Sequence, residues 1–228
     1  MTAAAPRGRL DPCLALIFDM DGVVIDSNPV HRRSWAAFNR RYGLETTEAM
    51  QQRMYGKRND EIVRDYFGDG LSNEEVVQRG AAKERLYREM IAGRVESMLV
   101  PGLKTFLREH AGAPMAVATN AEPENVVLVL TEGGLREYFQ VVVNGHQVRK
   151  AKPDPEIYLL AAQRLGATPA NCIVFEDSKS GIQAARNAGM RVVGILTTED
   201  NLSGVSICAD NFLSEDLRAW LAAQECVS

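Results

Sequence analysis

The feature that most constrains the fold is the alternation of short apolar segments with amphipathic stretches through residues 103–224. The apolar segments carry hydrophobic side chains at consecutive positions, which is typical of strands in a parallel sheet covered by helices on both faces. We expect strands at residues 14–18, 115–119, 141–144, 172–175, 192–195 and 208–212. We expect helices at residues 103–110, 123–132, 155–165, 180–188 and 216–224. The sequence therefore predicts the α/β class, with a doubly wound parallel sheet.

A long segment between the first two expected strands breaks this alternation. Residues 29–92 are rich in charge and carry no clear strand pattern, whereas helical stretches are expected at residues 34–42, 61–66 and 73–91. Gly43, Gly56 and Gly68 mark turns between them. The sequence predicts a core domain of residues 1–27 and 98–228, interrupted by a helical domain of residues 28–97.

Composition excludes several classes of function. The net charge is −4 and the pI about 5.5, whereas a general nucleic-acid-binding protein needs a basic surface. The longest apolar runs, at residues 13–18 and 126–130, are far shorter than the roughly 20 residues of a membrane-spanning helix. The N-terminal residues lack the apolar stretch of a signal peptide. We therefore expect no nucleic-acid or membrane partner, and a location in the cytoplasm.

The cysteines support the same location. Cys13, Cys172, Cys208 and Cys226 form no CxxC pair and share no metal-ligand spacing with the three histidines. We expect all four to be small thiols in a reducing compartment, mostly buried, with neither a disulfide nor a zinc site.

Polar residues follow several of the expected strands, where a doubly wound sheet binds its ligands. A basic loop also leads into the helix at residues 155–165. Clustered carboxylates with oxygen ligands favour Mg²⁺, and a lysine, a hydroxyl and a backbone N–H beside them would bind an anion. An aspartate can attack phosphorus while a neighbouring acid moves the proton. The pattern indicates phosphoryl transfer by these residues: Asp19, Asp21, Thr119, Asn120, Lys152, Glu176 and Asp177.

Four motifs stand in order along the chain, with the helical insert after the first. They are Phe18-Asp19-Met20-Asp21-Gly22-Val23-Val24, Ala118-Thr119-Asn120, Lys152-Pro153-Asp154-Pro155 and Phe175-Glu176-Asp177-Ser178-Lys179-Ser180-Gly181-Ile182-Gln183-Ala184-Ala185. With them, residues 14–220 resemble the haloacid dehalogenase superfamily, in its phosphatase and β-phosphoglucomutase-like branch with a helical cap. The resemblance implies a Rossmann-like core with an inserted cap, and a Mg²⁺-dependent phosphatase of a small phosphorylated metabolite, a sugar or polyol phosphate.

The resemblance also implies a role for each motif residue. Asp19 is expected to be the nucleophile and a Mg²⁺ ligand, and Asp21 the general acid and base, with its backbone carbonyl on the metal. Asp177 is expected to be a further Mg²⁺ ligand, with Glu176 beside it either as a direct contact or as an orienting group. The transferring phosphoryl group is expected to be held by Thr119, the Asn120 backbone N–H and Lys152.

Three cap residues are further candidates for substrate contact. His31 is expected to face the cleft, although an exposed or structural histidine fits the sequence equally well. Lys57 and Arg58 lie in a polar loop that suits an anionic or polyhydroxylated ligand, and the alternative is a solvated turn that opens a helix. Trp35, Phe38 and Tyr42 are spaced for one helix face and are expected in the core of the cap.

A sugar phosphate mutase is the main alternative activity. Mutases of this branch tend to carry a Lys-Asn pair where this chain has Glu122-Pro123, and a cap arginine where it has Asn59. Both differences favour hydrolysis. A phosphonate hydrolase would need a cap lysine that forms a Schiff base, for which Lys57 and Lys83 are the candidates. The sequence leaves the oligomeric state open between monomer and homodimer.

Overall fold

The computed structural model describes residues 10, 11 and 13–227 of the chain, and it confirms the predicted α/β fold. Six parallel strands form one sheet in the order β3-β2-β1-β4-β5-β6. The first strand therefore lies in the middle, between strands that come much later in the sequence. The strands are β1 Ala15–Phe18, β2 Met115–Ala118, β3 Val141–Val143, β4 Cys172–Glu176, β5 Arg191–Ile195 and β6 Ile207–Ala209.

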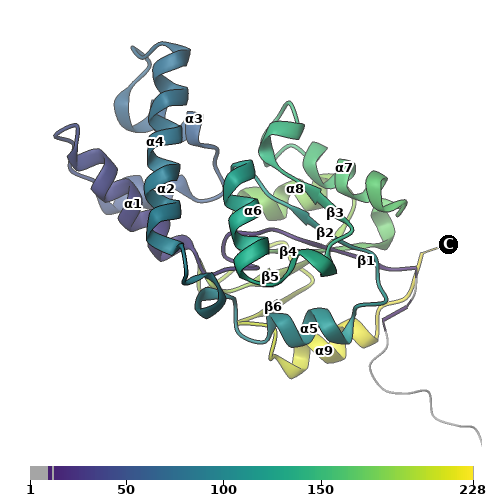
Figure 1. Cartoon of the computed structure of the whole chain (residues 1–228). Helices are drawn as coiled ribbons and strands as arrows, with labels where there is room; N and C mark the ends of the chain where they lie inside the picture. Colours follow the sequence, from purple (N-terminus) through teal and green to yellow (C-terminus); the bar gives the residue numbers. More distant parts are fainter. Residues whose placement is uncertain (1–9, 12, 228) are drawn as a thin grey trace, which may run out of the picture.

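Helices cover both faces of the sheet (Figure 1). Successive strand side chains point to opposite faces, so that Leu16 and Phe18 pack in one hydrophobic cluster while Ala15 and Ile17 pack in another. The first cluster lies under α5 Leu103–Glu109, α6 Pro123–Glu132 and α9 Glu215–Ala222, and the second under α7 Glu156–Leu165 and α8 Lys179–Asn187. Short 3₁₀ turns complete the core at η2 Arg136–Tyr138, η3 Gly145–Gln147 and η4 Pro169–Asn171.

Aromatic packing makes the centre of the core rigid near the end of β1. The rings of Phe18 and Phe175 stack with their centroids 4.6 Å apart, and Phe106 meets both rings edge-on. All three side chains are fully buried. Burial of each contributes about 1.5–3 kcal/mol, so the segment that follows β1 starts from a fixed position.

The inserted cap is helical, as predicted. It consists of α1 Asn28–Arg40, α2 Glu48–Met54, α3 Asn59–Phe67 and α4 Asn73–Ile91, followed by η1 Val95–Met98. Its own hydrophobic cluster includes Trp35 and Phe38, as expected, together with Ile62, Val63 and Tyr66. The expectation is wrong for Tyr42, which is 49% exposed because α1 ends at Arg40 and Tyr42 lies in the turn after it. The sequence prediction missed α2, whose start is marked by the Thr47 side chain accepting a hydrogen bond from the Met50 backbone N–H at 3.2 Å.

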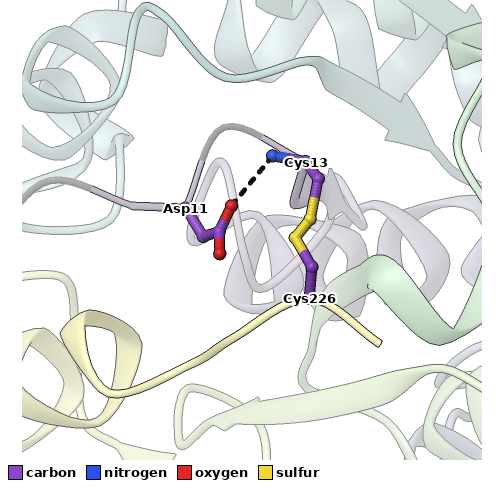
Figure 2. Close-up of side chains that lie close together, drawn as sticks. All are labelled: Asp11, Cys13 and Cys226. Atoms are coloured by element: carbon purple, nitrogen blue, oxygen red, sulfur yellow. Dashed lines mark hydrogen bonds between the residues drawn. A yellow bond between two sulfur atoms is a disulfide. The ribbon is translucent and has the colours of Figure 1, made fainter. Parts of the chain in front are cut away.

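The expectation of four thiols is wrong, because Cys13 and Cys226 form a disulfide (Figure 2). Their Cα atoms lie 6.1 Å apart although 213 residues separate them in sequence. The C-terminal segment reaches this position because Asn171 exchanges two hydrogen bonds with the Val227 backbone, of 2.7 and 3.2 Å. Cys172 and Cys208 remain thiols, and only Cys172 of these two is fully buried.

Within the part of the chain that the structure describes, no helix has both the length and the apolar character needed to cross a bilayer.

Candidate active site

The residues predicted at the strand ends meet at one edge of the sheet. Phe18 pairs in register with Val117 of β2 and Phe175 of β4, so the residues that follow these strands are neighbours. A cavity at this edge, between core and cap, is lined by described residues that include Asp19, Asp21, Thr119, Asn120, Lys152 and Asp177.

Lys152 holds the first carboxylate of the site. Its ammonium donates to Asp19 Oδ1 at 2.7 Å, to Glu176 Oε1 at 2.6 Å and to the Ala118 carbonyl at 3.2 Å. Burial raises the pKa of Asp19 to about 7, although the positive charge of Lys152 opposes the shift. The two carboxylates in turn raise the pKa of Lys152 above its usual range despite burial, so this lysine carries a permanent positive charge.

Glu176 uses both carboxylate oxygens within the protein. Oε1 accepts from Lys152 and from the Tyr158 hydroxyl at 2.6 Å, and Oε2 accepts from the Ser178 hydroxyl at 3.0 Å and its backbone N–H at 3.1 Å. Burial alone would raise the pKa of Glu176, but Lys152 and these donors hold it below its ordinary value. Among the described residues, the cavity lining includes Asp177 but not Glu176. This arrangement favours the orienting role for Glu176.

Asp177 directly follows β4 and is buried. Its Oδ2 accepts from the Asn28 side chain at 3.0 Å and from the Thr198 hydroxyl. Burial and the neighbouring carboxylates raise the pKa of Asp177 well above its ordinary value. Gly22, at φ +83°, leaves room for this carboxylate, because a Cβ there would overlap it.

The buried carboxylates near Lys152 could hold a divalent cation. Asp19, Glu176 and Asp177 are buried, and one ligand atom of each lies within 4.8 Å of the others. Lys152 offsets only part of their charge, and burial together with the neighbouring carboxylates raises the pKa of Asp19 and of Asp177, so an added positive charge would favour their ionised forms. Oxygen-only donors of this kind suit a hard cation.

Asp21 lies on the wall of the same cavity with a different environment. Its Oδ1 accepts from the Ser27 hydroxyl at 2.5 Å and lies 3.2 Å from His31 Nε2. Burial alone would raise the pKa of Asp21, but His31 and Ser27 hold it below the ordinary value. Without a bound cation or substrate, Asp19 is therefore harder to ionise than Asp21, which is the reverse of the order that the expected nucleophile and proton donor require.

The remaining core candidates also line the cavity. Thr119 is buried, and its hydroxyl accepts from the Ala121 N–H at 3.1 Å. Asn120 extends its side-chain amide to the Gly56 carbonyl of the cap at 3.0 Å. The Asn120 side chain thus joins the two domains, which leaves its backbone N–H for the expected anion contact.

The three cap candidates separate in the structure. His31 and Lys57 line the cavity. The guanidinium of Arg58 instead donates to the carbonyls of Gly145 at 2.7 Å and Val148 at 3.1 Å, both in the core. Arg58 thus fixes the cap loop to the core, while Lys57 is the cation of that loop that faces the cavity.

Sequence reasoning missed four residues of the site. Asn28 bonds Asp177, as described above, and three further side chains line the cavity from α4 and α6: Lys83, Glu84 and Asn125. The sequence indicates Lys83 only as a Schiff-base candidate of a phosphonate hydrolase. The sequence does hold one indication that Lys83 faces inward. It lies four residues before Tyr87, and residues i and i+4 share a helix face.

The chain is similar to known proteins in both sequence and fold. A model of the haloacid dehalogenase-like hydrolase family matches residues 13–189. The chain is 37% identical over 183 residues to the fructose-1-phosphate phosphatase YqaB of Escherichia coli K12, covering 79% of this chain and 95% of that protein. It is 34% identical over 189 residues to a phosphorylated carbohydrates phosphatase of Thermotoga maritima, covering 80% of this chain and 85% of that one.

A solved structure shows the same fold. The crystal structure of a β-phosphoglucomutase from Clostridium difficile superimposes with a TM-score of 0.82 at 24% identity, covering 91% of this chain and 96% of that chain.

Proposed function

Because the chain belongs to the haloacid dehalogenase-like hydrolase family, we propose that it is a Mg²⁺-dependent phosphatase of a small sugar or polyol phosphate. The observation that carries this proposal is the placement of Asp19 in the cavity, 2.7 Å from the charged Lys152, with Asp21 on the same wall. The phosphatases among its relatives support the reaction and the carbohydrate class of substrate.

In the first step, an oxygen of Asp19 attacks phosphorus and the bond from phosphorus to the substrate oxygen breaks. Asp21 donates its proton to the leaving oxygen, which departs as an alcohol. In the second step, water attacks phosphorus while Asp21 takes its proton, and the bond between phosphorus and Asp19 breaks. The products are inorganic phosphate and the free Asp19 carboxylate, so each step is balanced.

Asp21 must change protonation state between these steps. His31 and Ser27 favour its ionised form, which suits the second step. The first step needs the protonated form, and the negative charge of a bound phosphoryl group beside Asp21 raises its pKa in the required direction. The substrate itself therefore prepares the acid that releases its alcohol.

We assign the Mg²⁺ site to Asp19, Asp177 and the backbone carbonyl of Asp21. Bound Mg²⁺ would supply positive charge that favours ionised Asp19 and offsets the charge of the phosphoryl oxygens. Glu176 keeps Lys152 in place, and Lys152, Thr119 and the Asn120 N–H bind the phosphoryl group.

The cap would select the alcohol. Lys57, Asn59 and His31 present polar groups to the cavity, which fits the hydroxyls of a sugar or polyol. Glu122 accepts from Asn59 at 3.3 Å and lies 2.6 Å from His146. A carboxylate at this rim disfavours the second phosphate of a bisphosphate, which supports hydrolysis over the mutase alternative.

The test is phosphate release from a panel of sugar, polyol and nucleotide monophosphates that includes fructose 1-phosphate, with and without Mg²⁺. We expect Mg²⁺-dependent release that is lost in Asp19→Asn. Conversion of β-glucose 1-phosphate to glucose 6-phosphate with a bisphosphate primer, without phosphate release, would establish the mutase instead.

We place the movable cap at residues 28–97, and we expect a monomer or a homodimer with no nucleic-acid or membrane partner. A cytoplasmic location is also proposed, although the Cys13–Cys226 disulfide removes the support that unpaired cysteines gave it. Cell fractionation tests the location, and sedimentation tests the oligomeric state.

A further inference from the structure

An ion pair is buried in the cap where an apolar contact would cost less. Lys83 and Glu84 of α4 are 1% and 3% exposed, and Lys83 Nζ lies 2.8 Å from Glu84 Oε1. Charges taken out of water need several well-placed partners, because their mutual attraction only roughly offsets the loss of solvation. The partners of this pair lead in two directions, toward Asp21 and toward the core.

On the side of Asp21, Lys83 of this pair determines the tautomer and the orientation of His31. Lys83 Nζ lies 2.7 Å from His31 Nδ1. An ammonium group only donates, so Nδ1 accepts, and the ring hydrogen of a neutral His31 is on Nε2. Nε2 faces Asp21 Oδ1 at 3.2 Å, and Tyr87 stacks on the ring with centroids 3.8 Å apart. Lys83 thus aims the His31 Nε2–H at the proposed proton carrier.

Toward the core, the pair crosses the domain boundary. Glu84 Oε2 accepts from the side-chain amide of Asn125 at 2.6 Å. Asn125 belongs to α6 of the core and is 1% exposed. Its carbonyl oxygen accepts from Arg88 of α4 at 2.9 Å, so the two cap charges together dictate which way the amide faces.

We propose that Glu84 and Asn125 are positioning residues that form a catch between cap and core. When the cap closes on the core, the catch fixes Lys83, and Lys83 orients His31 against Asp21. This inference rests on the proposed function of Asp21 as acid and base. Asn125 and Lys83 both donate to Glu84, Lys83 also donates to His31, and His31 donates to Asp21, so the contacts form one continuous chain from the core to Asp21.

The catch differs from the other contacts between cap and core. Arg58 and the Asn59–Glu122 pair also join the domains, but neither continues to Asp21 through the contacts described. Of these three contacts between cap and core, only the catch links the packing of α4 against α6 to the position of the Asp21 side chain. Its loss should therefore slow the chemical step, whereas loss of the others should weaken closure and substrate binding.

A reciprocal exchange tests the catch. Asn125→Asp places a carboxylate against Glu84, and Glu84→Gln places an amide against the Asn125 amide, so each single variant sets like groups face to face. The double variant Glu84→Gln, Asn125→Asp restores one donor and one acceptor at the contact. Lys83 then keeps the amide oxygen at position 84, and Arg88 keeps a carboxylate at position 125. Asn125→Ala, which adds no charge, serves if a single variant fails to fold.

Two readouts are measured on each variant. The first is the NMR signal of the His31 Nε2–H, which needs neither substrate nor metal. The second is kcat and KM on the best substrate of the phosphate-release panel. We expect the single variants to lose the proton signal to solvent exchange and to lower kcat about ten- to a hundredfold with a smaller change in KM. We expect the double variant to recover both.

The outcomes separate the catch from a general structural role. Asp65→Asn, which removes the exposed Asp65–Arg53 ion pair of the cap, should change neither readout. A double variant no better than the singles, or a His31 signal unchanged in folded Asn125→Asp, overturns the inference. If the wild type hydrolyses no monoester, the proposed function fails, and the His31 signal still decides whether the catch exists.

Discussion

The core side and the cap side of the cavity each bury a lysine that is paired with a buried carboxylate, but they build that arrangement differently. On the core side, Lys152 joins Asp19 and Glu176, which are carried by adjacent strands of one sheet. On the cap side, Lys83 joins Glu84 and His31, which lie on two cap helices and meet the core through Asn125.

The two arrangements separate a fixed part of the site from an adjustable part. Strand register holds Asp19 and Glu176 together, and the loop before α7 brings Lys152 to them, so the cap carries none of the three. The cap cluster is complete only when α4 lies against α6. We infer that the core supplies the phosphoryl transfer and the cap decides when, and on which alcohol, it occurs.

The largest effect should follow from breaking the core cluster. In Lys152→Met, Asp19 and Glu176 lose their shared cation, and we expect kcat to fall by about a thousandfold. Leaving buried carboxylates unpaired should also destabilise the protein by about 3–5 kcal/mol in urea unfolding. The matched control is Lys150→Met, since Lys150 is exposed and lies 3.6 Å from Asp154. Equal losses in both variants would contradict the assignment of Lys152.

Removal of the disulfide tests whether the core can be destabilised without a change in the active site. Cys13 precedes β1, whereas the site follows it, so the bridge lies at the other end of the strand. Cys226→Ser should lower the free energy of unfolding by about 2–5 kcal/mol, because the bridge closes a very long loop. We expect kcat to be unchanged and reductant to destabilise the wild type but not the variant. A wild type insensitive to reductant would show that the bridge does not form.

The buried charge of Glu84 gives a pH-dependent measure of the cap cluster. Burial alone would raise the pKa of Glu84, but Lys83 and the other partners lower it from its ordinary 4.5 to about 2. A depressed pKa stabilises the fold above pH 4.5, and this stabilisation is lost as pH falls toward 2. The free energy of unfolding of the wild type should exceed that of Glu84→Gln by about 3 kcal/mol near neutral pH. The difference should shrink between pH 4.5 and 2; a constant difference would mean that Glu84 is not ionised in the fold.

The smallest effect should come from the cap loop. Arg58→Ala removes two hydrogen bonds to core carbonyls, so the closed cap becomes less stable while the core cluster is intact. We expect KM to rise about three- to tenfold with kcat nearly unchanged. A loss of kcat with constant KM would place Arg58 in the chemistry rather than in closure.

The core could be predicted from sequence because its constraints are local. Each site residue directly follows an apolar strand or lies in a short motif, and parallel strands bring such residues to one edge. The helix at 73–91 was also placed correctly, with Ser72 and Glu75 as a capping box. The helix α1 begins at Asn28, earlier than expected, because Pro29 is well suited to the first turn.

The cap cluster and the disulfide could not be predicted because both depend on long-range packing. Nothing near Glu84 in the sequence indicates that it meets Asn125 on another domain. Likewise, Cys13 and Cys226 become neighbours only once the sheet order places β1 at the centre and Asn171 holds the C-terminal segment. The orienting role of Glu176 could not be predicted either, because it depends on Tyr158 and Ser178, which donate hydrogen bonds to the Glu176 carboxylate only in the folded chain.

The most direct test of the account is to trap the covalent intermediate on the core side. Enzyme turning over its best substrate with Mg²⁺ is quenched with borohydride, which reduces an aspartyl phosphate to homoserine, and the peptides are sequenced by mass spectrometry. We predict homoserine at position 19, dependent on substrate and absent in Asp19→Asn. Homoserine at another aspartate, or phosphate release during turnover with position 19 never modified, would contradict the assignment of Asp19 as the nucleophile.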